Sequence, residues 1–492
     1  MDNDTLMQYF EWYLPNNCNL WNNLKKDANH LKNIGITSLW LPPAYKGAGG
    51  INDTGYGVYD LYDLGEFDQK GTIRTKYGTK EEYLDAISEL HKNNIKVYAD
   101  IVLNHKVGAD GTEEVLACKE SYNNRNNSIE ITNNIVPILA WTKYTFPGRG
   151  NTYSDFKWNW THFHGVDWDD RNRINSIFKF YGKRWDEDVD KENGNFDYLM
   201  GADIDLNNID VVNELTFWGK WYLKLADLDG FRLDAIKHIR SSFYLNWLRE
   251  MRNSTSKPLF AVGEYWSSNI SIINEYLEET NNCMSLFDVP LHYNFYEASI
   301  SGGNFDMSKI LDNTLLKCNP NKAVTFVDNH DTEPGQSLFS WVQDWFKPLA
   351  YSIILLRNEG LPCVFYGDYY GVPGQKIEPK NIILDKLLYL RKNYAYGKMN
   401  NYFDNSSIIG WTLEGDELHP NSGLATIISG NNSGSKQMHV GKQFSGCIFY
   451  DYLGNQKDKV LIDENGVGNF LVNTGSVSVW IKETSKRSYI NI

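Results

Sequence analysis

The stretch DGFRLDAIKH, residues 229–238, decides how the rest of the chain is interpreted. In a β-strand the side chains alternate, so Arg232 and Asp234 lie on one face while Phe231 and Leu233 lie on the other. One face therefore packs into a core, and the other carries either a structural ion pair or chemistry. An isolated pair of this kind is more often structural, because a buried charge has to be matched. The remainder of the sequence has to decide between these two interpretations.

Seven further short runs resemble the one at 229–238, and each is bounded by Gly, Pro, Asn or Asp. The eight runs begin at Leu6, Thr37, Lys96, Gly230, Leu259, Cys283, Ala323 and Cys363. Amphipathic helical patterns separate most of them, for example at 81–94 and 243–253. Strand and helix alternating eight times predict an α/β fold, the (β/α)8 or TIM barrel, whose active site lies at the C-terminal ends of the strands.

Two parts of the chain break this alternation. About 130 residues separate the third run from the fourth, which is too long for a barrel loop, and they predict an inserted β-rich subdomain followed by a helix at 211–228. After residue 397, alternating patterns between Gly and Asn turns predict a C-terminal antiparallel β-sandwich. We therefore expect barrel segments at 1–105 and 208–396, the insertion at 106–207 and the C-terminal domain at 397–492.

Composition limits the classes of partner. The chain of 492 residues has a net charge of −14 without a charged tail, which argues against nucleic acid. No run approaches 18 apolar residues and the first residues do not resemble a signal peptide, so we expect no membrane association and a cytoplasmic monomer. Secretion after removal of a leader is the alternative. The six cysteines are far apart, as is usual for reduced thiols.

Ionisable side chains gather at the predicted C-terminal ends of the strands. They are Asp100, Asn104 and His105 after the third run, Arg232 and Asp234 in the fourth, Glu264 in the fifth, and Asp328, His330 and Asp331 in the seventh. Packing alone does not explain so many charges at one rim, because each is costly to bury unless it is matched. This favours chemistry over a structural ion pair.

Four of these segments resemble the four sequence regions of the α-amylase family, in the family's order. They are DIVLNH (100–105), GFRLDAIKH (230–238), VGEYW (262–266) and FVDNHD (326–331). Flanking stretches such as MQYFEWYLP and NGNFDYLMGADID extend the similarity to nearly the whole chain, and resemble bacterial liquefying and intracellular α-amylases in particular. The resemblance implies a glycoside hydrolase acting on α-glucans, with a barrel, an insertion after the third strand and a C-terminal β domain.

The resemblance also implies a role for each catalytic residue. Cleavage with retention needs a carboxylate nucleophile and a carboxylic acid about 5 Å apart. Asp234 corresponds to the nucleophile and Glu264 to the acid that protonates the leaving oxygen and then activates water. Asp331 corresponds to the third carboxylate, which holds sugar hydroxyls and stabilises positive charge at the anomeric carbon. Arg232 would keep Asp234 ionised and oriented.

Six side chains correspond to substrate contacts of the family, although ordinary packing is the commoner role of a single His or Tyr. They are Tyr56 as a stacking face, His105 and His330 as hydrogen-bond partners of the sugar being cleaved, Lys237 and His238 on the acceptor side, and Trp12 in a more distant donor subsite. We assign Asp100 and Asp328 to the structure of the rim.

A calcium site is implied in the same way. Asn104, Asp197 and Asp203, with the backbone carbonyl of His238, correspond to its ligands, and hard oxygen ligands suit Ca²⁺. Without the resemblance, such Asp and Asn residues would more often be turn formers.

The sequence departs from the secreted relatives around further metal positions. His164 and Asn207 stand where those relatives have carboxylates, and His164 could pair with Asp186 instead. Ser407 and Gly430 stand at the acidic positions of another site, between the barrel and the C-terminal domain. We therefore expect one calcium ion and no metal cluster.

The function predicted from the sequence is an endo-acting, retaining α-amylase. It would hydrolyse internal α-1,4 bonds of starch, glycogen and malto-oligosaccharides through a covalent glycosyl-enzyme intermediate. A transglycosylase of the same family, which passes the sugar to another acceptor, is the alternative among enzymes. A catalytically silent glucan-binding protein is the alternative from another class, and the presence of all three acids together with Arg232 argues against it.

Overall fold

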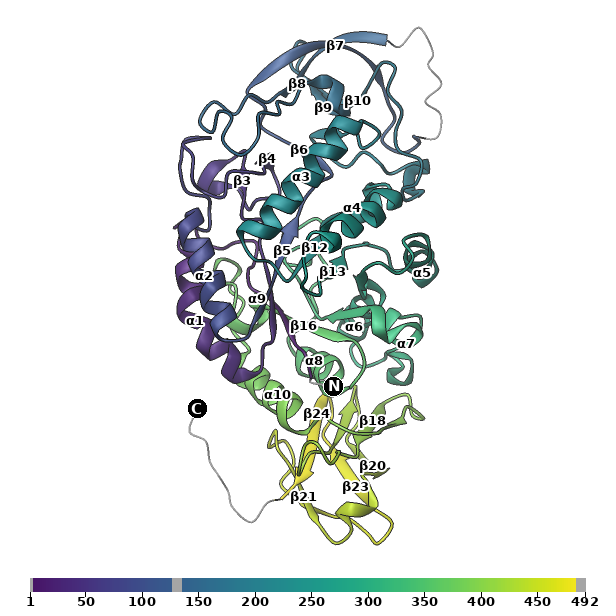
Figure 1. Ribbon diagram of the computed structural model, residues 1–492. Helices are drawn as coiled ribbons and strands as arrows, with labels where there is room; N and C mark the ends of the chain where they lie inside the picture. The colour runs from purple at the N-terminus through teal and green to yellow at the C-terminus, as the bar shows by residue number, and fades with distance from the viewer. Residues whose placement is uncertain (1–2, 126–134, 484–492) are drawn as a thin grey trace.

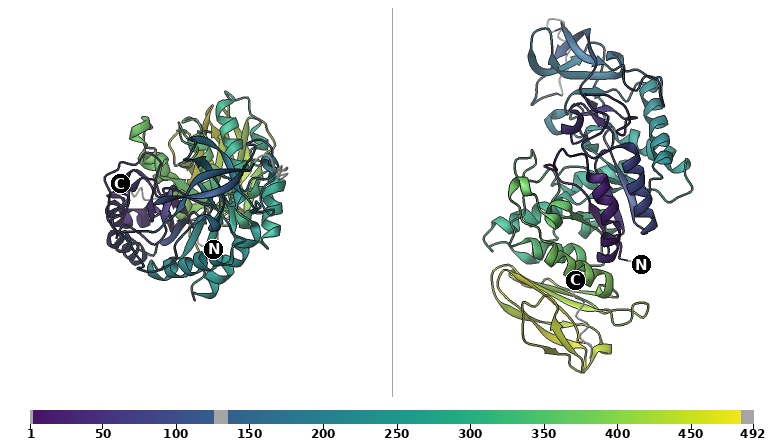
Figure 2. Two further views of the ribbon diagram at one scale, coloured as in Figure 1. Left: turned by 90° about the horizontal axis from the view of Figure 1, so that it is seen from above. Right: turned by 90° about the vertical axis from the view of Figure 1, so that its left-hand side faces the viewer.

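The computed structural model describes residues 3–125 and 135–483. Three groups of elements follow one another along the molecule: a mainly β insertion at one end, the α/β barrel in the middle and the C-terminal β-sheets at the other end (Figure 1). The second view in Figure 2 separates the same three groups. Residues 1–2, 126–134 and 484–492, which belong to the predicted barrel, insertion and C-terminal segments respectively, lie outside the described residues.

Eight parallel strands close the predicted barrel, in the order β1-β16-β15-β14-β13-β12-β5-β2. They are β1 (Leu6–Gln8), β2 (Ser38–Leu41), β5 (Lys96–Ile101), β12 (Gly230–Leu233), β13 (Phe260–Gly263), β14 (Ser285–Phe287), β15 (Ala323–Phe326) and β16 (Leu361–Phe365). Leu233 of β12 is level with Ile101 of β5 and with Gly263 of β13. The residues that follow these three strands therefore meet at one rim, as predicted.

The helical patterns of the sequence correspond to helices around the strands. Those at 81–94, 211–228 and 243–253 form α2 (Lys80–Lys92), α3 (Ile209–Leu225) and α4 (Ser241–Asn253). The other helices are α1 (Leu20–Ile34), α5 (Ile270–Glu279), α6 (Val289–Ile300), α7 (Leu315–Cys318), α8 (Lys347–Leu356), α9 (Tyr366–Tyr370) and α10 (Asn381–Tyr394). Within the described residues, no helix combines the length and the apolar character that crossing a membrane requires.

The insertion is built on a six-stranded sheet, which confirms the β-rich subdomain. Its strands, in spatial order, are β6 (His105–Lys106), β11 (Ala202–Ile204), β9 (Phe163–Asp169), β10 (Ile174–Phe180), β7 (Gly111–Lys119) and β8 (Ile135–Lys143). The first and last strands of the insertion are neighbours, with Asp203 opposite His105. The chain therefore leaves and re-enters the barrel at one place, next to the rim described above.

The strands β3 (Lys46–Gly47) and β4 (Val58–Asp60) pair as a small hairpin, and Tyr56 lies in the segment that connects them. The sequence patterns do not predict this hairpin. Strands of two and three residues are too short for alternation to be recognised in the sequence.

The C-terminal domain is the predicted sandwich. A six-stranded sheet and the β20–β23 pair enclose a core that includes Phe470 and Trp480.

Within the described residues, eight strands form the C-terminal domain. They are β17 (Met399–Tyr402), β18 (Ile408–Leu413), β19 (Leu424–Ser429), β20 (Gly434–His439), β21 (Ile448–Asp451), β22 (Val460–Leu461), β23 (Val467–Val472) and β24 (Ser476–Lys482). A turn between residues 461 and 467 separates β22 from β23.

Candidate active site

Arg232 is the centre of the ionisable cluster and is completely buried. Its Nη1 atom lies 2.8 Å from Oδ1 of Asp100 and 2.7 Å from Oδ1 of Asp234. Its Nη2 atom forms an ion pair with Glu264, 2.7 Å from Oε2. Carboxylates that follow or end three neighbouring strands thus converge on one guanidinium, whose planar fork of donors suits this arrangement.

Backbone hydrogen bonds fix the two predicted catalytic acids just beyond the ends of their strands. The N–H of Asp234 donates to the carbonyl of Ile101 at 3.0 Å, and the N–H of Glu264 donates to the carbonyl of Leu233 at 2.9 Å. Both acids are more than nine-tenths buried. Because one guanidinium touches both carboxylates, the two lie within the span of a single Arg side chain.

The loop after β15 brings Asp331 to the same rim. Oδ1 of Asn329 accepts from the N–H groups of Asp331 and Thr332 at 2.9 and 3.0 Å, which closes a tight turn. Nε2 of His330 lies 3.4 Å from Oδ2 of Asp331. Asp328, assigned to the rim structure, forms a buried ion pair with Lys347 at 2.7 Å.

Three aromatic rings stack into a wall beside these acids. The ring of Tyr56 lies 5.1 Å from that of His330 and 5.9 Å from that of Trp12, with interplanar angles of 11° and 10°. His105 holds the Tyr56 carbonyl through Nε2 at 2.9 Å. Gln8, which sequence reasoning missed, places Nε2 3.1 Å from Nδ1 of His330. The structure thus puts Trp12 directly against the rings nearest to the acids.

Burial controls the protonation of the site. Burial raises the pKa of Asp234, and the repulsion of Glu264 adds to the rise while Arg232 opposes it. Burial raises the pKa of Asp331 to about 7, with Glu264 again adding to the effect. Burial lowers the pKa of His105 and His330, so both imidazoles are neutral at pH 7. The site therefore offers neutral hydrogen-bonding rings beside two acids, Asp234 and Asp331, whose pKa values are raised.

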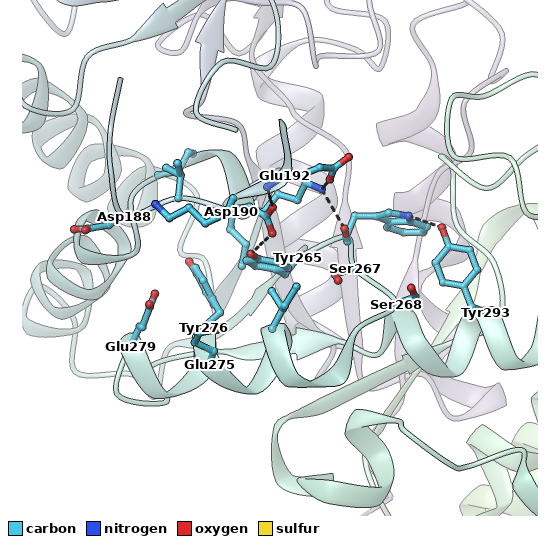
Figure 3. Close-up of a pocket in the computed structure, with 17 residues that line it drawn as sticks. Asp188, Asp190, Glu192, Tyr265, Ser267, Ser268, Glu275, Tyr276, Glu279 and Tyr293 are labelled. Carbon is cyan, nitrogen blue, oxygen red and sulfur yellow. Dashed lines mark hydrogen bonds and ion pairs between the residues drawn. The ribbon is translucent and has the colours of Figure 1, made fainter. Parts of the chain in front are cut away.

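A cavity of about 630 Å³ lies between residues 188–192 of the insertion and α5 (Figure 3). The residues that follow Asp234 and Glu264 along the chain, among them Lys237 and Tyr265, line it. Lys237 reaches into it and places Nζ 2.8 Å from Oε2 of Glu192, which belongs to the insertion. Trp266 forms part of its wall and donates from Nε1 to the hydroxyl of Tyr293 at 3.0 Å. Trp266 lies in the VGEYW motif, which could have indicated it, whereas no pattern in the sequence singles out Glu192.

His238, predicted on the acceptor side, faces the insertion. Its Nδ1 atom lies 2.7 Å from the carbonyl of Phe196, and its ring packs edge-on against the ring of Phe196. Burial lowers the pKa of His238 to about 3, so the imidazole is neutral. This contact fixes Phe196 next to Asp197, one of the predicted metal ligands.

The predicted calcium ligands lie where the insertion meets the barrel. Asp203 is opposite His105, and the N–H of Ile204 donates to the carbonyl of Asn104 at 3.0 Å. Burial raises the pKa of Asp203 well above its usual range, and the repulsion of Asp197 adds to the rise. Two buried carboxylates that repel each other are hard anionic donors of the kind that Ca²⁺ prefers.

His164 occupies the space between these carboxylates. Its Nδ1 atom lies 3.0 Å from Oδ2 of Asp203 and 3.2 Å from Oδ2 of Asp197, and its Nε2 atom lies 3.0 Å from Oδ1 of Asp205. Burial opposes protonation, but the hydrogen bonds to the three carboxylates raise the pKa of His164 well above its usual value. The protonated imidazole of His164 therefore supplies part of the positive charge that balances these carboxylates.

The expected ion pair between His164 and Asp186 is wrong. Ligand atoms of His164, Asp186 and Asp197 lie within 4.8 Å of one another, but Asp186 accepts its side-chain hydrogen bond from Nδ2 of Asn207, at 2.6 Å. Asn207 stands where secreted relatives were expected to have a carboxylate, and its amide takes over the contact with Asp186. The imidazole is drawn to three other carboxylates instead.

Ser407 and Gly430, which stand where secreted relatives were expected to have acidic metal ligands, contact each other. The N–H of Gly430 donates to the carbonyl of Ser407 at 3.0 Å, at the edge of the C-terminal domain. Neither supplies a carboxylate, so this pair gives a hard cation no charged ligand.

The chain is similar to known proteins over most of its length. Residues 21–405 match the family model described as "Alpha amylase, catalytic domain", and residues 424–481 match the one described as "Alpha-amylase C-terminal". An α-amylase of Geobacillus stearothermophilus is 57% identical over 490 residues, covering 99% of this chain and 88% of that protein. A cytoplasmic α-amylase of Escherichia coli is 42% identical over 497 residues, covering 98% and 99%.

A solved structure of an Anoxybacillus α-amylase is similar in fold, with a TM-score of 0.64, 17% identity and coverage of 99% of this chain and 98% of that chain. The matched domains, the close relatives and the cluster of acids around Arg232 lead to one conclusion: this chain belongs to the α-amylase family of glycoside hydrolases.

Proposed function

We propose that this enzyme hydrolyses internal α-1,4-glucosidic bonds of starch, glycogen and malto-oligosaccharides with retention of configuration. The observation that carries the proposal is the single guanidinium of Arg232 in contact with both Asp234 and Glu264. Carboxyl groups that close together leave no room for a water molecule between nucleophile and sugar, which favours the double-displacement route. The relatives named α-amylase support the substrate class.

In the first step of this proposal, a carboxylate oxygen of Asp234 attacks the anomeric carbon. The bond between that carbon and the glycosidic oxygen breaks, and Glu264 gives its proton to the departing oxygen. In the second step Glu264 takes a proton from water, the water oxygen bonds to the anomeric carbon, and the bond to Asp234 breaks. Retention follows from the two inversions.

The surrounding residues stabilise the positive charge that develops on the ring. Asp331 faces the same cluster and would accept hydrogen bonds from sugar hydroxyls as charge develops. His105 and His330 are neutral and can donate to or accept from other hydroxyls. Tyr56 and Trp12 present ring faces to the apolar face of a sugar. We assign Lys237 and the cavity of Figure 3 to the acceptor side.

We also propose that one calcium ion binds Asn104, Asp197, Asp203 and the carbonyl of His238. When bound, it would add a hard charge that links the insertion to the barrel and neutralises the buried acids. His164 already neutralises part of that cluster, which supports one ion in place of several.

The similarity to the Escherichia coli protein named cytoplasmic α-amylase supports a cytoplasmic location.

A timed digest of soluble starch tests the reaction and the mode of cutting together. Endo hydrolysis predicts that polymer length collapses while few reducing ends have formed, followed by a steady rise in reducing ends. Removal of units from a chain end would shorten the polymer gradually and would contradict the endo mode. Redistribution of oligosaccharide lengths at constant reducing ends would instead identify a transglycosylase.

A further inference from the structure

The loops that follow β1 and β15 are fastened to each other beside the aromatic wall. The hydroxyl of Tyr13, in the loop after β1, donates to the carbonyl of Pro334 at 2.6 Å, and Nε2 of Gln336 donates to the same hydroxyl at 2.9 Å. The N–H of Trp12 donates to Oε1 of Glu333 at 3.4 Å. The position of the Trp12 ring therefore depends on the loop that carries Asp331.

Glu333 is buried in an unusual way for an acidic residue. Its exposed fraction is 0%, and its Oε2 atom has no hydrogen-bond partner. The hydrogen bond from Trp12 is the one hydrogen bond to its carboxyl group within the described part of the chain. An ionised carboxylate would retain its full desolvation cost here, because a single long hydrogen bond offsets little of it.

The charged groups around Glu333 are acids as well. Glu11, after β1, is 2% exposed and accepts from the N–H of Tyr13. Glu11, Asp328 and Asp331 all repel a negative charge on Glu333, and Lys76 acts on Glu11. The site thus combines burial with three neighbouring acids, and this combination favours the neutral carboxylic acid.

We propose that Glu333 is a positioning residue that works as a neutral acid: while protonated, it holds the loop after β1 against the loop after β15 and keeps Trp12 on the ring wall, and its ionisation releases Trp12. The proton passes to solvent base when the carboxyl group ionises. Burial, followed by the charge of Glu11, raises the pKa of Glu333 to about 9, which supports the geometric argument. Sugar binding should then weaken in alkaline solution, and this loss should depend on the carboxyl group of Glu333.

The inference rests on the proposed function in one respect, that the ring wall binds an α-glucan. Binding is best measured with the Glu264→Gln variant, because it removes turnover and the ionisation of the catalytic acid from the readout. Maltohexaose is the probe, and its dissociation constant is measured by calorimetry at pH 8 and pH 10. With Glu333 present, the constant should rise about tenfold, since the binding-competent fraction falls by that factor across a pKa near 9.

Two double variants make this test specific. Glu264→Gln with Glu333→Gln keeps a neutral side chain of the same shape, so its dissociation constant should change less than twofold between the two pH values. Glu264→Gln with Glu333→Ala should bind weakly at both, because the contact to Trp12 is lost. An equal alkaline loss of affinity with and without Glu333 would overturn the proposal.

Thermal unfolding separates this inference from the proposed function, because it needs no sugar. The folded protein keeps the Glu333 proton up to about pH 9, whereas the unfolded chain releases it near pH 4.5. Stability therefore falls as pH rises through this window, and the melting temperature of Glu333→Gln minus that of the parent should grow from pH 5 to pH 9. Glu297→Gln, an exposed change on α6, is the matched control and should show a constant difference.

A flat difference for Glu333→Gln would overturn the neutral-acid assignment whatever the sugar results are. If the difference in melting temperature grows with pH but maltohexaose does not bind, Glu333 is still a neutral acid. That result would overturn its role in positioning a glucan-binding wall, together with the proposed substrate.

Discussion

The Nη1 atom of Arg232 lies 2.7 Å from Oδ1 of Asp234, one residue beyond the end of β12. The same guanidinium contacts Asp100 and Glu264. A permanent positive charge with several directed donors orients all three carboxylates and offsets part of the cost of burying them together. The two predicted catalytic acids are therefore held in fixed positions relative to each other.

Replacement of Arg232 by Lys tests the geometry of this contact more than its charge. Lysine carries the same charge at a single point, so it cannot reach three carboxylates at once. We expect kcat to fall by at least about 100-fold, which corresponds to the loss of a preorganised electrostatic contact. Kinetics on a malto-oligosaccharide, with circular dichroism to verify folding, measure the effect.

The exposed Arg249→Lys on α4 is the matched control for this change and should leave kcat unchanged. If Arg232→Lys retained activity within threefold of the parent, the bridging role of the guanidinium would have to be abandoned.

Asp331→Asn should abolish most activity and also change the dependence of stability on pH. The pKa of Asp331 is about 7 in the folded protein and near 3.9 in an unfolded chain. The folded state therefore holds a proton that the unfolded chain has released, so the parent loses stability as pH rises from about 4 to 7. The variant lacks this loss. The free energy of unfolding of the variant minus that of the parent should therefore increase by about 2 to 4 kcal/mol between pH 4 and pH 7.

Denaturant unfolding at pH 4, 5.5 and 7 measures this gain, and the exposed Asp458→Asn in the C-terminal domain is the control. A difference between variant and parent that stays constant over the three pH values would exclude the raised pKa of Asp331.

Chelation should lower the melting temperature and the activity together, because removal of a cation leaves Asp197 and Asp203 repelling each other. Addition of calcium should restore both. Metal analysis of the dialysed protein should find one calcium ion per chain, since His164 supplies positive charge to the neighbouring carboxylates. Several tightly held ions per chain, or a melting temperature insensitive to chelator, would refute this view of the cluster.

Lys237→Ala tests the acceptor side of the cleft. Lys237 reaches into the cavity beside Trp266, so its loss should raise the KM for maltohexaose about three- to tenfold with a smaller change in kcat. Its partner Glu192 is largely exposed, so leaving that carboxylate unpaired costs little. The exposed Lys224→Ala on α3 serves as the control. A fall in kcat at unchanged KM would place Lys237 in a different role.

Sequence reasoning reached the parts of the molecule that local patterns encode. The alternation around Arg232 predicted its contact with Asp234, and periodicity predicted the barrel and three of its helices to within a few residues. Neighbouring strands then brought Glu264 to the same rim without further information.

The contacts that escaped prediction join residues far apart in the chain. Gln8 meets His330 across the loops after β1 and β15, and Glu333 meets Trp12 in the same way. His164 was expected beside Asp186, but the pairing of β11 with β9 brings Asp203 closer. Such contacts depend on register and loop conformation, which no short motif specifies.

The stereochemistry of the released sugar shows whether Asp234 forms a bond to the anomeric carbon during the reaction. Proton NMR during the first minutes of a maltohexaose digest, before mutarotation, identifies the anomer formed. If Asp234 is the nucleophile, the α-anomer appears first and the β-anomer follows only by mutarotation. Initial release of the β-anomer would contradict this role.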